Sequence, residues 1–152
     1  MLATTTTELP DHRYRLETGG CPIEAVMDVI GGRWKALLLF RLGKRPARFN
    51  ALRKSLPHVS SQMLVRQLRE LERDGLVRRT AAPDSPAKVE YAPTAAALAL
   101  MPLLIGLRDW GARHLLGLSG EALAARLEAC GWPPLPEAMA EAGDRADDGR
   151  GA

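Results

Sequence analysis

Apolar residues recur at helical spacing between residues 59 and 79, and the rest of the chain is best understood as support for this stretch. Leu64, Leu68 and Leu71 follow the i, i+4, i+7 spacing of a buried helical stripe. The opposite face carries an amide and three cations, Gln62, Arg66, Arg69 and Arg73. Because no acidic row matches them, this face is suited to binding an anion. The pattern also fits an amphipathic helix whose arginines are only solvated, so the helix alone does not decide its function.

The two ends of this helix are encoded by local chemistry. Ser60 is a suitable N-cap, because its hydroxyl can accept a hydrogen bond from a free backbone N–H of the first turn. Asp74-Gly75 is expected to end the helix, since glycine readily adopts the left-handed conformation of a helix C-terminus. Residues 76–80 then favour a strand, so the helix is predicted to lead directly into a β-hairpin.

Three shorter helical patterns precede this stretch. They cover residues 22–30, 33–42 and 49–56. Cys21 occupies the cap of the first, and Gly43 is expected to end the second, before a short strand piece through Ala47. A three-residue turn, Pro57-His58-Val59, joins the third pattern to the arginine-bearing helix. A helix, a short turn and a second helix with a basic outer face is the arrangement of a helix-turn-helix.

A hairpin and two further helices are predicted to follow. Residues 76–80 and 88–92 read as strands on either side of a turn-rich tip. Residues 94–116 predict a long helix that begins or kinks at Pro102, and residues 119–130 predict one more. The fold class is therefore expected to be mainly α with a small β-hairpin wing, that is, a winged helix-turn-helix.

One domain with two tails accounts for the 152 residues. Residues 1–20, which include four consecutive threonines, are expected to be a flexible arm. Residues 21–118 are expected to form the winged helix-turn-helix domain together with its dimerisation helices. Residues 119–152 are expected to form an accessory helix and then a loose acidic tail, because proline, glycine and acidic side chains dominate from Gly131 on.

Charge is distributed unevenly along the chain. The net charge is only +3, but residues 31–80 carry 13 Lys and Arg against three acidic residues, Glu70, Glu72 and Asp74. Both ends of the chain are acidic. A basic middle is typical of a domain that binds phosphates. It disfavours the rival interpretation, a winged-helix protein–protein adaptor without DNA binding, which would more readily present an exposed apolar patch.

Other classes of protein are disfavoured by the absence of their signals. No apolar run approaches the roughly 18 residues of a membrane span, and the chain opens without a hydrophobic signal core, which favours the cytoplasm. Cys21 and Cys130 do not make a disulfide scaffold, and His12, His58 and His114 lack metal-ligand spacing. Neither a glycine-rich phosphate loop nor a nucleophile–base pair is visible. We therefore expect no enzyme, no catalytic residue, no metal and no cofactor.

A series of short motifs runs in order through the middle of the chain. They are Cys21-Pro22, Gly31-Gly32-Arg33-Trp34, the segments 48–53 and 67–77, Ser60, Met63-Leu64, the wing segments 83–86 and 88–91, Thr94 and Trp110-Gly111. On these motifs, residues 21–116 resemble the HxlR-type winged helix-turn-helix transcriptional regulators of bacteria, relatives of the MarR group. Gln62 stands where these regulators usually have a basic residue, and Val65 where they have threonine, so their base preference is not carried over. Ala95-Ala96-Ala97 replaces a glycine-containing start of the last helix.

The resemblance implies a sequence-specific DNA-binding transcriptional regulator that acts as a homodimer through its first and last helices. Its partner would be double-stranded DNA carrying a palindromic operator. A small-molecule effector is a further candidate partner, because some similar regulators use the cysteine at the position of Cys21 to sense oxidants, quinones or aldehydes. A helix N-terminus favours the reactive thiolate. The alternative is a small capping residue packed at a dimer contact, without a redox role.

The expected DNA contacts follow from side-chain chemistry. Arginine can bind guanine O6 and N7 bidentately and glutamine can bind adenine, so Gln62 and Arg66 are the expected base readers. Ser60 and Ser61 suit a phosphate at the helix N-terminus, and Val65 can meet a thymine methyl group. The other candidates are Arg69 one turn deeper, Arg48, Arg53 and Lys54 for flanking phosphates, and Lys88 on the wing for the minor groove. Each arginine of the helix could instead be solvated and paired with Glu70 or Glu72.

Overall fold

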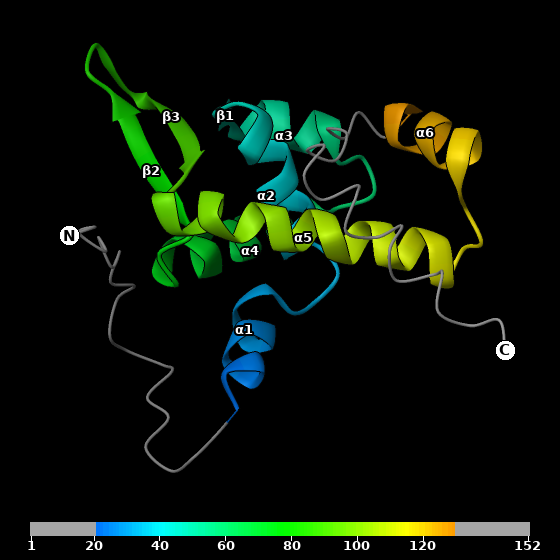
Figure 1. Ribbon diagram of the computed structural model, residues 1–152. Helices are drawn as coiled ribbons and strands as arrows, with labels where there is room; N and C mark the ends of the chain where they lie inside the picture. Colours follow the sequence, from blue (N-terminus) through cyan, green and yellow to red (C-terminus); the bar gives the residue numbers. More distant parts are fainter. Residues whose placement is uncertain (1–20, 130–152) are drawn as a thin grey trace, which may run out of the picture. The chain divides into compact units, whose positions relative to one another are not determined.

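The computed structural model describes residues 21–129, without the side chain of Ala82. Its elements, drawn in Figure 1, follow one another as α1 (Pro22–Ile30), α2 (Lys35–Lys44), β1 (Ala47–Arg48), α3 (Phe49–Ser55), α4 (Ser61–Arg73), β2 (Val77–Ala82), β3 (Ser85–Pro93), α5 (Ala95–His114) and α6 (Gly120–Ala129). The chain forms two compact units, and the division between them falls within α5, between Met101 and Pro102. The predicted arm, the predicted acidic tail and Cys130 lie outside the described residues.

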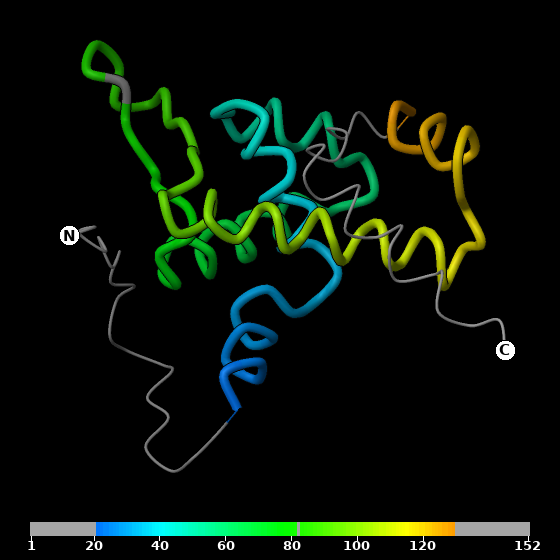
Figure 2. The backbone as a smooth tube through the Cα atoms, in the orientation of Figure 1, coloured from blue at the N-terminus to red at the C-terminus, as the bar shows by residue number. Residues whose placement is uncertain are grey.

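The sheet confirms the predicted wing. Its strands are antiparallel in the order β1-β3-β2, and β3 pairs with both neighbours. Ala47 lies opposite Tyr91, and Val77 lies opposite Pro93. The β2–β3 hairpin extends beyond β1 to a free tip, which the backbone trace in Figure 2 makes clear. A mainly helical chain with a small antiparallel sheet is the fold class that the sequence predicts.

Two details of the predicted elements are wrong. Gly43 does not end α2, which continues to Lys44. Gly43 is not among the glycines with positive φ, and the chain leaves the helix at Arg45, whose backbone is extended. The strands of the wing also reach further into the predicted turn, because β2 continues to Ala82 and β3 already begins at Ser85.

The core of the first unit contains the stripe that the helical spacing predicts. Its largest fully buried side chains are Leu38, Leu39, Leu42, Leu52, Leu64, Leu68 and Leu71. Three of them come from α4, three from α2 and one from α3. Because one face of α4 is committed to this core, its opposite face is fixed toward solvent.

Local hydrogen bonds fix both ends of α4, as predicted. The Ser60 hydroxyl accepts a hydrogen bond from the Met63 backbone N–H at 3.2 Å. Gly75 has a φ of 74°, a left-handed conformation that glycine adopts without strain. The Thr94 hydroxyl donates to the Gly75 carbonyl at 2.7 Å and also accepts from the Ala97 N–H, so one side chain joins the end of α4 to the start of α5.

The second unit contains the C-terminal part of α5 and the helix α6. Arg108 and Asp109 form an ion pair of 2.6 Å with both side chains nearly covered. α5 is one helix of 20 residues that contains Pro102, so the helix does not begin at this proline. It includes a stretch of mean hydropathy 1.3, so by length and composition it could cross a membrane. The core helix of a soluble protein satisfies the same test.

Candidate nucleic-acid interface

The exposed face of α4 carries the polar side chains that the sequence places there. Gln62, Arg66, Arg69 and Arg73 are all exposed, whereas Val65 is half-buried. Gln67, which is not among the predicted site residues, is buried at 8% exposure. The face therefore presents one amide and three guanidinium groups over about three helical turns.

A surface hollow of about 610 Å³ runs along this face. It is lined by Phe49, Ser61, Gln62, Val65, Arg66, Arg69, Glu70 and Arg73. Five of the predicted DNA-contacting residues thus meet in one place. The other predicted contacts do not line this hollow: Ser60 caps the helix, and Arg48, Arg53, Lys54 and Lys88 are exposed on neighbouring elements.

A second hollow, of about 500 Å³, adjoins the base of the wing. Its lining combines α4 with the sheet: Phe49, Val65, Arg69, Glu72, Arg79 and Tyr91. Sequence reasoning missed Arg79, although the Arg78-Arg79 pair at the start of the wing was a visible signal. Since Arg69 and Arg79 share this hollow, the basic face of α4 continues onto β2.

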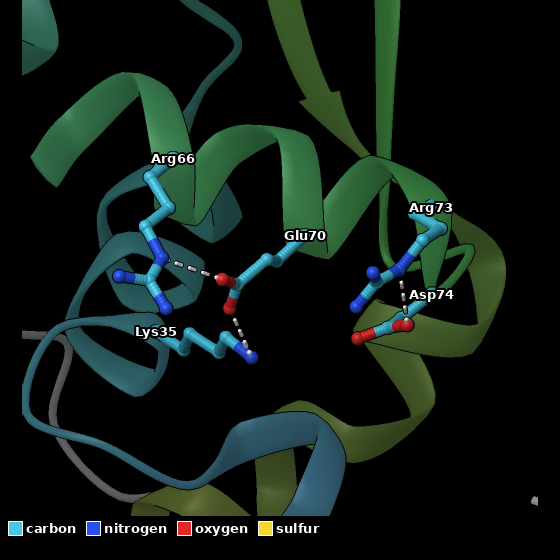
Figure 3. Close-up of polar contacts among 5 residues, drawn as sticks. All are labelled: Lys35, Arg66, Glu70, Arg73 and Asp74. Carbon is cyan, nitrogen blue, oxygen red and sulfur yellow. Dashed lines mark hydrogen bonds and ion pairs between the residues drawn. The ribbon is translucent and has the colours of Figure 1, made fainter. Parts of the chain in front are cut away.

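One carboxylate joins the basic face to the interior of the first unit (Figure 3). Glu70 Oε1 lies 3.0 Å from Arg66 Nε, and Glu70 Oε2 lies 2.8 Å from Lys35 Nζ. The hydrogen bond from Lys35 is the main cause that lowers the pKa of Glu70, partial burial opposes it, and Arg66 lowers it further. The carboxylate is therefore ionised at neutral pH. The alternative in which helix arginines pair with Glu70 holds for Arg66.

Arg73 is directed to a different carboxylate. Its Nε lies 3.5 Å from Oδ1 of Asp74, whose side chain is completely buried at the end of α4 (Figure 3). That distance is too long for a good hydrogen bond, although it allows an ion pair. Arg73 thus lines the hollow, while its guanidinium pairs with the residue that follows the last turn of the helix.

Cys21 stands at the N-cap of α1, as the sequence predicts, and it is exposed. Its backbone carbonyl accepts a hydrogen bond from the Glu24 N–H at 2.9 Å, whereas its side chain makes no capping hydrogen bond. The thiol is therefore accessible to a reagent. Within residues 21–129 no group of three or more His, Cys, Asp or Glu side chains is arranged to hold a metal ion.

The model of the HxlR-like helix-turn-helix family matches residues 29–117, more than half of the chain. The chain belongs to this family. Among its relatives, the HTH-type transcriptional regulator YdeP of Bacillus subtilis is 44% identical over 95 residues, which cover 62% of this chain and 74% of YdeP. Transcriptional regulation through DNA binding is the function of the family, so this member is a regulator and not an enzyme.

Solved structures of two regulators share the fold. The redox regulator HypR in its oxidised form is 40% identical, with a TM-score of 0.56 over 60% of this chain and 94% of HypR. The reduced transcriptional regulator YodB from B. subtilis is 27% identical, with a TM-score of 0.60 over 67% of this chain and 100% of YodB. YodB has also been solved after diamide treatment and with quinone bound.

Proposed function

We propose that this HxlR-like protein is a cytoplasmic transcriptional regulator that binds a palindromic operator as a homodimer and reads its bases with the exposed face of α4. The observation that carries the proposal is the shared hollow of Ser61, Gln62, Val65, Arg66 and Arg69. These residues belong to the second helix of a helix-turn-helix, the element that enters the major groove in such domains.

The residues near the start of α4 have distinct roles in this proposal. Arg66 binds guanine O6 and N7, and Gln62 binds adenine N6 and N7. Ser61 and the free backbone N–H groups of the first turn bind a phosphate. The Ser60 hydroxyl accepts its capping bond from Met63, and it can still donate its own proton to a phosphate oxygen. Val65 is half-buried and presents its methyl groups to a thymine.

Cations on the neighbouring elements bind the DNA backbone. Arg53 and Lys54 are exposed in the last turn of α3, and Arg48 is exposed in β1 directly before that helix. Lys88 is exposed on β3 and reaches the minor groove from the wing. Arg69 supplements them from α4. Their contribution is independent of sequence, because it comes from neutralising phosphates and releasing counterions.

The rival function, a protein–protein adaptor, is disfavoured by the same surface. An adaptor is expected to offer an exposed apolar patch where DNA would otherwise bind. The α4 hollow instead has three arginines and a glutamine in its lining.

Recovery of duplexes from sheared genomic DNA by the purified chain distinguishes a DNA-binding regulator from a protein–protein adaptor. The proposal predicts strong enrichment of a few fragments that share an inverted repeat, whereas recovery in proportion to input would contradict it.

Dimerisation is proposed from apolar side chains that the monomer leaves exposed. On α1, Ile23 and Met27 are more than half exposed, and the same holds for Leu103, Leu107 and Trp110 on α5 and for Leu115 directly after it. Exposed large apolar side chains in such numbers mark an association surface.

We expect light scattering to report a dimer of the wild-type protein at micromolar concentration. Leu107→Glu should shift the equilibrium toward the monomer, because the substitution places a charge in an apolar contact. A wild-type monomer would contradict the proposal.

Cys21 is proposed as the point at which a thiol-reactive effector acts. The support is its exposure at the cap of α1 and the likeness to YodB, a regulator solved with quinone bound. The thiolate adds to a quinone ring carbon: the sulfur lone pair forms the C–S bond, the ring C=C π bond breaks, and its electrons move to a carbonyl oxygen, which takes a proton from water. The substituted ring carbon then loses its proton and the second oxygen gains one, which gives the hydroquinone thioether. An adduct at a dimer-forming helix changes the spacing of the two α4 helices, which the DNA fixes at about 34 Å per turn.

The Cys21 proposal predicts a difference between two proteins in a gel-shift titration. Quinone treatment should weaken operator binding by the wild type about tenfold or more, which corresponds to about 1.4 kcal/mol. Cys21→Ser should keep its affinity. Cys130 is present in both proteins and serves as the internal control. An equal response of the two proteins would leave Cys21 as a capping residue only.

A further inference from the structure

Three side chains form an ion network that runs from the interior of the first unit to the exposed face of α4 (Figure 3). Lys35, the first residue of α2, is only 6% exposed at its side chain, whereas the Arg66 side chain is 72% exposed. Glu70 lies between them and uses one oxygen for each cation. A single carboxylate therefore connects a buried ammonium group with an expected base reader.

The two contacts of Glu70 differ in what they do for the fold. The buried Lys35 ammonium needs a counter-ion, because an unpaired charge away from water is strongly unfavourable. The exposed Arg66–Glu70 pair contributes little to stability. Its order along the helix, with the cation four residues before the anion, is also the less favourable one. Stability alone therefore accounts for the Lys35 contact but not for the Arg66 contact.

We propose that Glu70 is a positioning residue that holds Arg66 in the orientation for reading guanine, with Lys35 fixing Glu70 from behind. The inference rests on the proposed role of Arg66 as a base reader. The guanidinium group is planar and rigid, so a hydrogen bond at Nε determines the direction of the whole group. Glu70 binds Nε, which leaves the two terminal nitrogens for the bidentate contact with O6 and N7.

The order imposed by Glu70 acts on affinity through entropy. A free arginine side chain samples many rotamers and loses them when it binds a base. Glu70 is itself held by a buried partner, so Arg66 is already restrained before DNA arrives. Removing the carboxylate should therefore reduce discrimination at the base pair that Arg66 reads, and leave discrimination at the other base pairs unchanged.

The test measures the affinity of Glu70→Gln for the operator and for duplexes with single base-pair replacements. A bidentate contact gives about 5- to 150-fold discrimination, and we expect Glu70→Gln to lose about fivefold or more of it at the Arg66 guanine. Glu72→Gln is the matched control, because it removes the same charge from an exposed position two residues away on α4. Each variant removes one repulsive charge, so both should bind duplexes without the Arg66 guanine slightly better, but only Glu70→Gln should lose guanine discrimination.

Two further variants distinguish a failure of the positioning role of Glu70 from unfolding of the protein and from a failure of Arg66 as the base reader. In an Arg66→Ala background, Glu70→Gln should have no additional effect on base discrimination. If Glu70→Gln unfolds because Lys35 loses its counter-ion, the double variant Lys35→Met/Glu70→Gln removes both charges and should show the same loss at guanine. Full discrimination in a folded Glu70 variant would overturn the positioning role. Full discrimination in Arg66→Ala would instead overturn the proposed base reader itself.

Discussion

Arg66→Ala is expected to lower specific operator affinity by about 1–3 kcal/mol, the value of one good bidentate contact with a base. Arg66 is the most exposed member of its ion network and lines the α4 hollow beside Gln62. Alanine also removes the hydrogen bond to Glu70, but that carboxylate keeps its stronger contact with Lys35. The fold should therefore persist. Fluorescence anisotropy with the operator and with single base-pair variants measures the loss and shows whether it falls on one base pair.

Lys54→Ala provides the comparison for Arg66→Ala. Lys54 is exposed in the last turn of α3 and does not line the α4 hollow. Its removal should weaken binding to every duplex alike and reduce the slope of log K against log salt by about one unit. If Arg66→Ala behaved in the same way, with operator discrimination intact, Arg66 would be a phosphate contact and the reading face would be placed wrongly.

Leu68→Ala should have the largest effect on stability, a loss of about 2–5 kcal/mol in the free energy of unfolding. Leu68 is 1% exposed and belongs to the buried stripe of α4, so the truncation removes apolar contacts and leaves a cavity. Urea denaturation followed by circular dichroism measures the shift of the midpoint. Arg69→Ala, one residue further on the exposed face, is the matched control and should change stability by about 0.5 kcal/mol or less. Equal midpoints in the two variants would contradict the assignment of the two faces.

The sequence predicts α4 well because its signals are local. The leucine spacing determines the buried stripe, and Ser60 and Gly75 determine the ends through bonds to their own neighbours. The exposed polar face then follows directly from helical geometry. The order of the helices and the presence of the wing can be predicted equally well from the sequence, because turn residues separate each element from the next.

Features that depend on contacts between distant parts of the chain could not be predicted from local sequence patterns. The Lys35–Glu70 pair joins residues 35 positions apart, and a lysine at the start of an amphipathic helix is normally solvated. Arg79 shares a hollow with Arg69 only because the sheet places β2 beside α4. In each case tertiary packing overrides a reasonable local interpretation.

Sequence-specific binding of duplex DNA by this protein can be measured as the ratio of two affinities. The ratio compares the recovered operator with a scrambled duplex of the same composition, titrated with the wild-type protein at a fixed, near-physiological salt concentration. We predict a ratio of about 1,000 or more, the usual margin of specific over non-specific binding. A ratio close to one, with the same salt slope for both duplexes, would show that the protein does not bind DNA sequence-specifically.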